Sequence, residues 1–266
     1  MEAFAFYNRP KTGIQNKFLK GILFMFRTIT TVLFVALYLI LSSPYMIITF
    51  FWSKIDPKKG GDAALRNVSW AFGIVTRLSG MRPTVTGIGN IPKDKAVLFV
   101  CNHQSILDTP LTYPLMISQT GYISKDTMGR VPLLRIWMKR LHCIFLDRKS
   151  PRAGLDMILK SIEYIKSGIS IFIFPEGTRN KGNVDEIAEF KAGAVKMASK
   201  TGCPIIPVAI AGTRKVFEDH APFLRRGQVR VAFGEPIDIA SLTEEQKKHL
   251  ADYCHDKVQE LYNSIK

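Results

Sequence analysis

Hydrophobic and polar residues follow two different patterns along the chain. Residues 28–53 carry no charged side chain, and this run is longer than the roughly 20 apolar residues that cross a bilayer. Beyond residue 80, short apolar runs rich in β-branched and aromatic residues alternate with segments whose apolar positions recur at the helical period. We therefore expect a membrane-anchoring helical segment at residues 1–60 and one folded domain at residues 61–266.

The apolar N-terminal run is interrupted at Ser42-Ser43-Pro44, and proline ends or kinks a helix. Two arrangements stay open: one transmembrane helix, or two shorter helices that lie in one leaflet. Basic residues flank both ends of the run, which favours a monotopic anchor with both ends on the same side. The polar, Gly-rich residues 55–65 predict a linker, and residues 66–80 predict an amphipathic helix.

The rest of the chain predicts an α/β fold. Several runs (AVLFV, ISIFIF, IIPVAI) are apolar at every position, as in strands that are buried on both faces. We expect a mixed, mostly buried sheet flanked by helices, with an interruption of the IIPVAI strand at Pro207. The predicted strands are 83–87, 95–101, 120–124, 142–146, 169–174, 204–210 and 228–233, and the predicted helices are 107–117, 131–140, 152–167, 186–201 and 244–264.

Charge and cysteine usage narrow the classes of partner. A net charge of +15 indicates an anionic partner, either a nucleic acid, an acidic membrane or a phosphorylated substrate. We expect no nucleic acid, because the aromatic residues sit in apolar runs rather than among basic ones. Four widely spaced cysteines without a CxxC pair predict buried free thiols and no metal site.

Polar residues directly after the predicted strand 95–101 suggest a catalytic site, because such strand ends line the active crevice of α/β sheets. His103 and Asp108 are close enough in sequence to meet across one turn. A carboxylate on one imidazole nitrogen leaves the other nitrogen free to act as a base. A histidine that only forms a local hydrogen bond, beside an ordinary Asp108, is the competing interpretation.

Two further strand ends carry charge. In Phe174-Pro175-Glu176-Gly177-Thr178-Arg179, the glycine permits a tight turn and the arginine suits a phosphate; a structural Glu–Arg pair is the alternative. The run Ile144-Phe145-Leu146-Asp147-Arg148 ends a third buried strand in charged residues.

Together, the blocks NHQSILD, FLDR, FPEGTRN and IIPVAI, in this order between about residues 85 and 235, resemble the glycerolipid acyltransferase family, and specifically its 1-acylglycerol-3-phosphate acyltransferases. One departure concerns Leu141-His142-Cys143-Ile144-Phe145, because relatives usually have a glycine a few residues before F-x-D-R. The backbone path at this point is therefore open. Asn180 stands where serine is common in the family.

The resemblance implies a role for each matching residue. His103 would be the general base, oriented by Asp108, with Asn102 and Ser105 supporting the turn. The acceptor would be bound by Lys125, Arg148, Glu176, Gly177, Thr178 and Arg179, with Arg179 and Lys125 on its phosphate. The family uses no metal, and the reaction needs no cofactor beyond the acyl donor.

The expected reaction transfers a fatty acyl group from acyl-CoA or acyl carrier protein to the sn-2 hydroxyl of lysophosphatidic acid, giving phosphatidic acid in phospholipid biosynthesis. The expected partner surface is a phospholipid membrane, at the cytoplasmic face of a bacterial inner membrane. Alternatives are another lysophospholipid or lyso-aminolipid acceptor, a non-catalytic lipid-binding relative, and a hydrolase, which the absence of a G-x-S-x-G motif disfavours. The sequence does not fix the oligomeric state.

Overall fold

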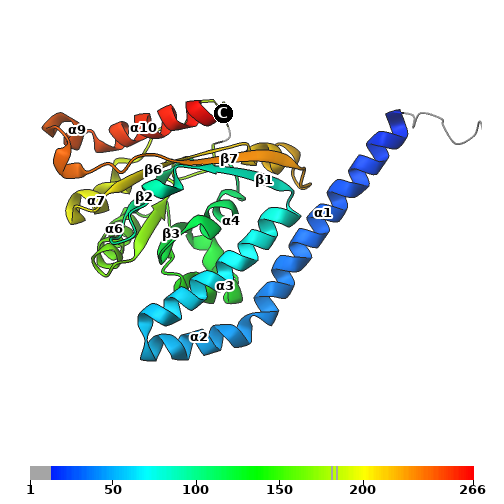
Figure 1. Cartoon of the computed structure of the whole chain (residues 1–266), viewed down its shortest axis with the longest axis horizontal. Coiled ribbons are helices and arrows are strands. Elements are labelled where there is room, and N and C mark those ends of the chain that lie inside the picture. The colour runs from blue at the N-terminus through cyan, green and yellow to red at the C-terminus, as the bar shows by residue number, and fades with distance from the viewer. Residues whose placement is uncertain (1–12, 181, 184) are drawn as a thin grey trace, which may run out of the picture.

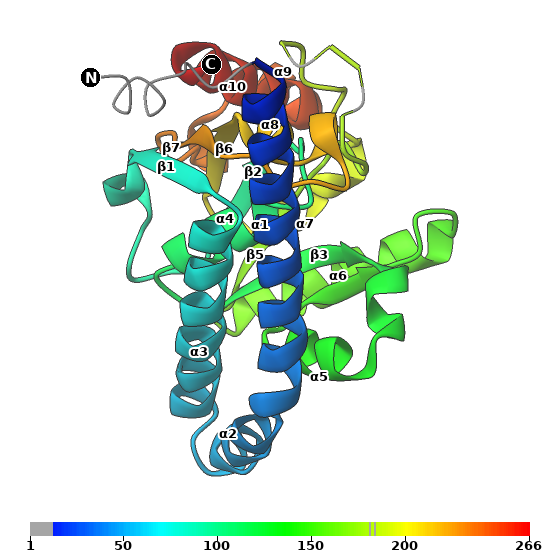
Figure 2. The same cartoon turned by 90° about the vertical axis from the view of Figure 1, so that its right-hand side faces the viewer.

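The structure is a computed structural model that describes residues 13–180, 182–183 and 185–266, with side chains from residue 21 onward. A helical arm precedes an α/β domain (Figure 1). The arm consists of α1 (Gly13–Leu41), α2 (Ser43–Ile55) and α3 (Pro57–Leu78). Helices α1 and α3 lie side by side, and α2 joins their far ends (Figures 1 and 2).

The α/β domain is built on one sheet of seven strands in the order β1-β7-β6-β2-β5-β3-β4. Neighbouring strands are parallel except for β6 and β7, which are antiparallel, so the sheet is mixed as expected. All seven predicted strands are present. They are β1 (Met81–Thr86), β2 (Leu98–Cys101), β3 (Thr120–Lys125), β4 (Ile144–Leu146), β5 (Ser170–Ile173), β6 (Ile205–Ala211) and β7 (Gly227–Phe233).

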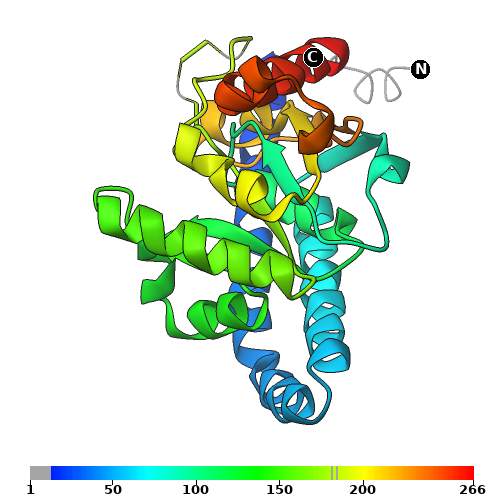
Figure 3. The same cartoon turned by 90° about the vertical axis from the view of Figure 1, so that its left-hand side faces the viewer.

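Helices cover both faces of the sheet, which explains the strands that are apolar at every position. In β2, Phe99 and Cys101 face one core while Leu98 and Val100 face the other, and all four are buried. The first core packs against α3, α4 (Asp108–Thr112) and α5 (Pro132–Arg140). Figure 3 looks onto the second face, covered by α6 (Pro151–Lys166), α7 (Lys196–Thr201) and α10 (Leu250–Ile265).

The apolar N-terminal run forms two helices that meet at Ser42, with Pro44 in the first turn of α2. The break follows from proline, which lacks the N–H that would continue the α1 ladder. By length and composition alone, the segment Gly21–Leu41 is long and apolar enough to cross a membrane, and only 6% of its most apolar stretch is buried. The run is therefore divided between two helices, of which α1 is long enough to cross a bilayer.

The prediction of a linker at residues 55–65 is wrong, because α3 begins at Pro57 and runs through both glycines. A Cβ on Gly60 would lie 2.6 Å from the Cα of Ser53, and one on Gly61 would lie 2.4 Å from Oε1 of Gln119. The glycines therefore allow α3 to pack closely on α2 and on the domain. The division into residues 1–60 and 61–266 stays a prediction, and its boundary falls inside α3.

Four other elements differ from the sequence prediction. The helix expected at 107–117 is shorter than predicted: α4 ends at Thr112, and a short 3₁₀ turn that contains Pro114 follows it. The helix expected at 244–264 is divided at His249 into α9 (Glu244–Lys248) and α10. The helix expected at 186–201 shrinks to α7, and β6 passes through Pro207 without the expected interruption.

Hydrogen bonds from distant residues explain the missing helix before α7. The backbone N–H of Ile187 donates to Gln259, and that of Ala188 donates to Glu176. The N–H of Lys191 donates to the carbonyl of Pro175. The N–H of Lys191 is thereby removed from the helical ladder, while Ile187 and Ala188, whose N–H groups would have no partner within a first helical turn, are held by the distant side chains. Tertiary contacts therefore keep residues 186–191 as a loop. The four cysteines are buried and free, as predicted.

Candidate active site

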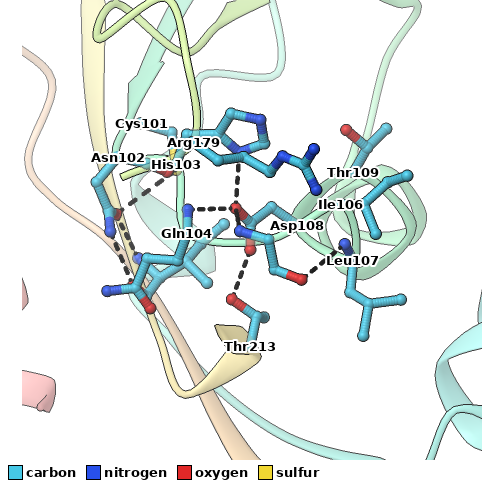
Figure 4. Close-up of polar contacts among 12 residues, drawn as sticks. Cys101, Asn102, His103, Gln104, Ile106, Leu107, Asp108, Thr109, Arg179 and Thr213 are labelled. Atoms are coloured by element: carbon cyan, nitrogen blue, oxygen red, sulfur yellow. Dashed lines mark hydrogen bonds and ion pairs between the residues drawn. The ribbon is translucent and has the colours of Figure 1, made fainter. Parts of the chain in front are cut away.

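His103 and Asp108 meet in the turn between β2 and α4, as the sequence predicts. Nδ1 of His103 lies 2.8 Å from Oδ2 of Asp108, whose side chain is completely buried. Oδ2 also accepts the N–H groups of Gln104 and Ser105, each at 2.8 Å, and Oδ1 accepts the hydroxyl of Thr213 at 2.6 Å. Figure 4 shows Asp108 at the centre of these contacts. The carboxylate is therefore held by four donors.

The imidazole of His103 is held by a second contact besides Asp108. Its ring stacks on Phe174 with the centroids 4.1 Å apart. Because Nδ1 faces Asp108, Nε2 is the nitrogen available to a substrate, and within the described chain no residue forms a hydrogen bond with it. A base with one oriented nitrogen and one free nitrogen can take a proton from a hydroxyl.

Asn102 and Ser105 lie where they support the turn. The side-chain amide of Asn102 donates to the carbonyl of Ile210 at 2.9 Å, and its oxygen accepts the N–H of the same residue at 2.8 Å. This pairing fastens the end of β2 to β6. The hydroxyl oxygen of Ser105 accepts the N–H of Leu107 at 3.0 Å, so it shapes the approach to α4 rather than facing outward.

The turn that follows β5 is tied to the same loop. Glu176 is 6% exposed, and its carboxylate accepts the N–H groups of His103 and Ala188. The N–H of Asn180 donates to the carbonyl of His103 at 2.8 Å. Glu176 therefore lies beneath the base and holds its backbone, whereas the sequence prediction placed this residue among those that contact the acceptor.

Burial raises the pKa of Glu176 to about 7. The two backbone N–H groups oppose this rise, and the negative charge of Asp108 reinforces it. Gly177 has a φ of 73°, a left-handed conformation that favours glycine, and a Cβ there would lie 2.9 Å from Nζ of Lys191. The tight turn expected at this glycine is present.

The positively charged residues predicted to bind phosphate gather at the same edge of the sheet. Arg179 is exposed, and its Nη1 lies 3.0 Å from Oε1 of Glu218. Arg148 is near enough to Arg179 for their charges to repel: burial, followed by this repulsion, lowers the pKa of Arg148, and Asp126 opposes the change. Lys125 ends β3, where it pairs with Leu146 of β4. Thr178 is exposed in the turn beside Arg179.

Two residues of the site were not predicted from the sequence. Thr213 follows β6 at another strand end, so the same rule that selected His103 could have selected it. Glu218 has no such signal, because it lies in a short 3₁₀ turn far along the chain. Its Oε1 accepts the N–H of Ile106 at 2.8 Å as well as the guanidinium of Arg179. Its Oε2 is buried and has no hydrogen-bond partner among the described residues.

The segment before F-x-D-R, where relatives usually have a glycine, contains a left-handed residue. His142 has a φ of 58°, and no other described residue besides glycine has a positive φ. Its Nε2 lies 3.1 Å from Oε1 of Gln119, and its ring meets Tyr164 edge to face. The backbone path is therefore the one a glycine would favour, and side-chain contacts hold the histidine in it. No group of three metal-ligating side chains occurs among the described residues.

Comparison with known proteins places this fold and site in an enzyme class. A family model described as acyltransferase matches residues 82–211. The 1-acyl-sn-glycerol-3-phosphate acyltransferase of Borreliella burgdorferi is 32% identical over 71% of this chain and 75% of its own length. The enzyme of that name from Haemophilus influenzae is 30% identical over 70% of this chain and 80% of its own length. The match to a chloroplastic relative from Brassica napus, 33% identical, spans 51% of that protein.

A solved structure shares the fold over nearly the whole chain. The crystal structure of the 1-acyl-sn-glycerophosphate (LPA) acyltransferase PlsC from Thermotoga maritima superposes with a TM-score of 0.72 at 26% identity. The match covers 90% of this chain and 97% of that one. The fold is that of an acyltransferase. Within that class, the chain belongs to the 1-acyl-sn-glycerol-3-phosphate acyltransferase family.

Proposed function

We propose that the chain transfers a fatty acyl group from a thioester to the sn-2 hydroxyl of lysophosphatidic acid and releases phosphatidic acid. The observation that carries the proposal is the His103–Asp108 pair, which leaves Nε2 of His103 free at the sheet edge where Arg148 and Arg179 gather. A base for an alcohol and cations for a phosphate are the two requirements of this acceptor. The relatives named above support the same substrate.

The proposed mechanism is direct transfer to the acceptor alcohol. Nε2 of His103 removes the proton of the sn-2 hydroxyl as its oxygen attacks the thioester carbonyl, and Asp108 stabilises the imidazolium that forms. The tetrahedral intermediate collapses, the C–S bond breaks, and the thiol leaves with the proton from His103. The proposed reaction steps use no metal and no further cofactor.

The phosphate of the acceptor would be bound by Arg179, Arg148 and Lys125. Arg179 is exposed and is held by one carboxylate, Glu218, from which it can turn toward a ligand. An arginine fork can form two parallel hydrogen bonds with a phosphate, so the exchange of partners keeps its charge paired. In this arrangement Gly177 and Thr178 form the rim of the acceptor site.

The helical arm would hold the enzyme on the membrane that contains its lipid substrates. Helix α1 packs along α3, and the hydroxyl of Tyr38 on α1 donates to Asn67 on α3 at 3.1 Å. Because α1 stays attached to the domain, we propose a monotopic arm rather than a separate transmembrane helix, at the cytoplasmic face of a bacterial inner membrane. Exposed apolar side chains for this contact are Ile22, Leu23, Phe26, Ile29, Val32 and Leu33 on α1 and Ile47, Ile48, Phe50 and Phe51 on α2.

The acyl donor would be acyl-CoA or acyl carrier protein. Both carry phosphate groups, and the segment from Lys125 to Arg152 has eight basic and two acidic residues. Such a surface attracts either donor.

The test is phosphatidic acid formation from lysophosphatidic acid by membranes containing the wild type or His103→Ala, with each donor offered separately. We expect product from the wild type with at least one donor and a loss of several orders of magnitude in the variant. Activity that persisted in the variant would contradict the base. A wild type inactive with both donors would contradict the acceptor or would indicate a non-catalytic relative, and a panel of other lysolipids would separate the two.

A further inference from the structure

Three arginines meet where α1 crosses the loop before β7. Arg27 lies on α1, and Arg225 and Arg226 end the loop. The hydroxyl oxygen of Thr28 accepts the N–H of Leu224 at 2.8 Å, and the guanidinium of Arg225 lies 4.9 Å from the ring centre of Phe24. Segments nearly 200 residues apart in sequence thus bring the charges of Arg27 and Arg226 close together, with the guanidinium of Arg225 beside Phe24 on the same helix.

A glycine makes room for the first of these side chains. Gly80, with a φ of 84°, follows α3, and a Cβ there would lie 2.8 Å from Nη1 of Arg27 and 3.1 Å from Cα of Arg226. The guanidinium of Arg27 therefore rests on the Gly80 backbone beside Arg226. This contact with the backbone of Gly80 restricts where the Arg27 guanidinium can lie.

The cluster has no counter-charge within the described part of the chain. None of the ion pairs there includes Arg27, Arg225 or Arg226. Nη1 of Arg27 is buried without a hydrogen-bond partner, and the charge of Arg226 repels that of Arg27. An unpaired buried donor and two like charges both raise the free energy of this arrangement. A bound anion would offset the repulsion.

The side chains beside these arginines indicate which kind of molecule carries the anion. Leu23, Phe26 and Ile29, in the turns of α1 around Arg27, are 52%, 64% and 55% exposed, and Phe223, two residues before Arg225, is 43% exposed. Arginines beside exposed apolar side chains are typical of a bilayer surface, where the guanidinium meets headgroup phosphates and the apolar groups meet acyl chains. A phosphate with lipid tails satisfies both parts of this surface.

We propose that Arg27 and Arg226, with Arg225 beside them, bind the headgroup phosphate of an anionic phospholipid, and so seat both α1 and the loop before β7 on the membrane. The proposal does not depend on the proposed reaction. It gives the α/β domain its own contact with the bilayer, through residues beyond the helical arm.

The test uses the full chain, purified in a non-ionic detergent and titrated with dioctanoyl phosphatidylglycerol while its melting temperature is followed. Arg27→Gln and Arg226→Gln are compared with the wild type and with Lys200→Gln, which changes an exposed cation on α7. We expect phosphatidylglycerol, but not dioctanoyl phosphatidylcholine, to raise the melting temperature. Each of the two site variants should bind phosphatidylglycerol about fivefold more weakly, and Lys200→Gln should match the wild type.

Three results would overturn the proposal. If both site variants bound phosphatidylglycerol as tightly as the wild type does, these arginines would not bind lipid. An equal shift with inorganic phosphate or glycerol 3-phosphate would show a site for soluble anions. A raised KM for lysophosphatidic acid with unchanged phosphatidylglycerol affinity would place the arginines in the acceptor site. Arg226 is exposed, so Arg226→Gln remains informative if Arg27→Gln does not fold.

Discussion

The two sides of the candidate site are built differently. On the base side, Asp108 is fully buried and accepts hydrogen bonds from four donors, one of them on His103. On the phosphate side, the side chain of Arg179 is 43% exposed and pairs with a single carboxylate, Glu218. The comparison shows that the proton-transfer groups are set in place before the substrate binds, whereas the cation can exchange partners when a phosphate arrives.

The largest effect is expected on the base side. Asp108→Asn keeps the volume but removes the charge that stabilises the imidazolium and fixes its tautomer. We expect kcat to fall on the order of 10³- to 10⁴-fold with little change in KM, measured as phosphatidic acid formation by purified enzyme. Asp156→Asn, at an exposed position of α6, is the matched control. A loss below tenfold would mean that the buried carboxylate does not assist the base.

A smaller and more selective effect is expected on the phosphate side. Arg179→Ala should lower kcat/KM for lysophosphatidic acid about 10- to 100-fold, because it removes charge-assisted hydrogen bonds to the phosphate. The same variant should treat 1-acylglycerol, which lacks the phosphate, like the wild type. Lys200→Ala, at an exposed position of α7, is the matched control. Equal losses of kcat/KM with both acceptors would show that Arg179 maintains the structure of the site and does not bind the phosphate.

Glu176, whose buried carboxylate accepts the backbone N–H of His103, should make the free energy of unfolding depend on pH. Its folded pKa of about 7 lies above the ordinary value of 4.5, so the folded state retains a proton that the unfolded state loses. This contribution to the free energy of unfolding is complete below pH 4.5 and is lost as the pH rises through 7, by on the order of 3 kcal/mol. Glu176→Gln should lack this component when melting temperatures are compared from pH 4.5 to 8, while the exposed control Glu163→Gln should retain it. Parallel profiles for Glu176→Gln and wild type would refute the raised pKa.

The smallest effect is expected from Thr213, one of the four donors to Asp108. Thr213→Val removes a hydroxyl that donates at 2.6 Å and should lower kcat about tenfold. Thr213→Ser restores the donor and should recover most of the activity, which distinguishes loss of the hydrogen bond from loss of packing. If serine recovers nothing, Thr213 acts through its methyl group in the core.

The sequence predicts the elements whose cause is local. All seven predicted strands are present because short runs rich in β-branched, aromatic or other apolar residues mark them, most clearly in β2, β5 and β6. His103 and Asp108 meet because five residues suffice to close one turn. The pattern at residues 66–80 likewise identified the part of α3 that faces the core, where Val68 and Val75 are buried. In these segments the local pattern and the tertiary structure agree.

The errors concern residues whose structure depends on distant partners. Gly60 and Gly61 suggested a linker, but their lack of side chains serves close packing inside α3. Residues 186–191 have a helical pattern, yet Glu176 and Gln259 capture their N–H groups. Glu218 reaches the site through the fold, from more than 100 residues after Ile106. Local sequence patterns do not predict any of these contacts, because each partner is distant in the sequence.

The most direct test of the central claim is a double-mutant cycle on His103 and Asp108. If Asp108 acts only through the imidazole, His103→Ala with Asp108→Asn should lose no more kcat than His103→Ala alone. Phosphatidic acid formation by the purified wild type, the two single variants and the double variant is the measurement. Losses that multiply in the double variant would contradict the account, because the carboxylate would then contribute to catalysis independently of the base.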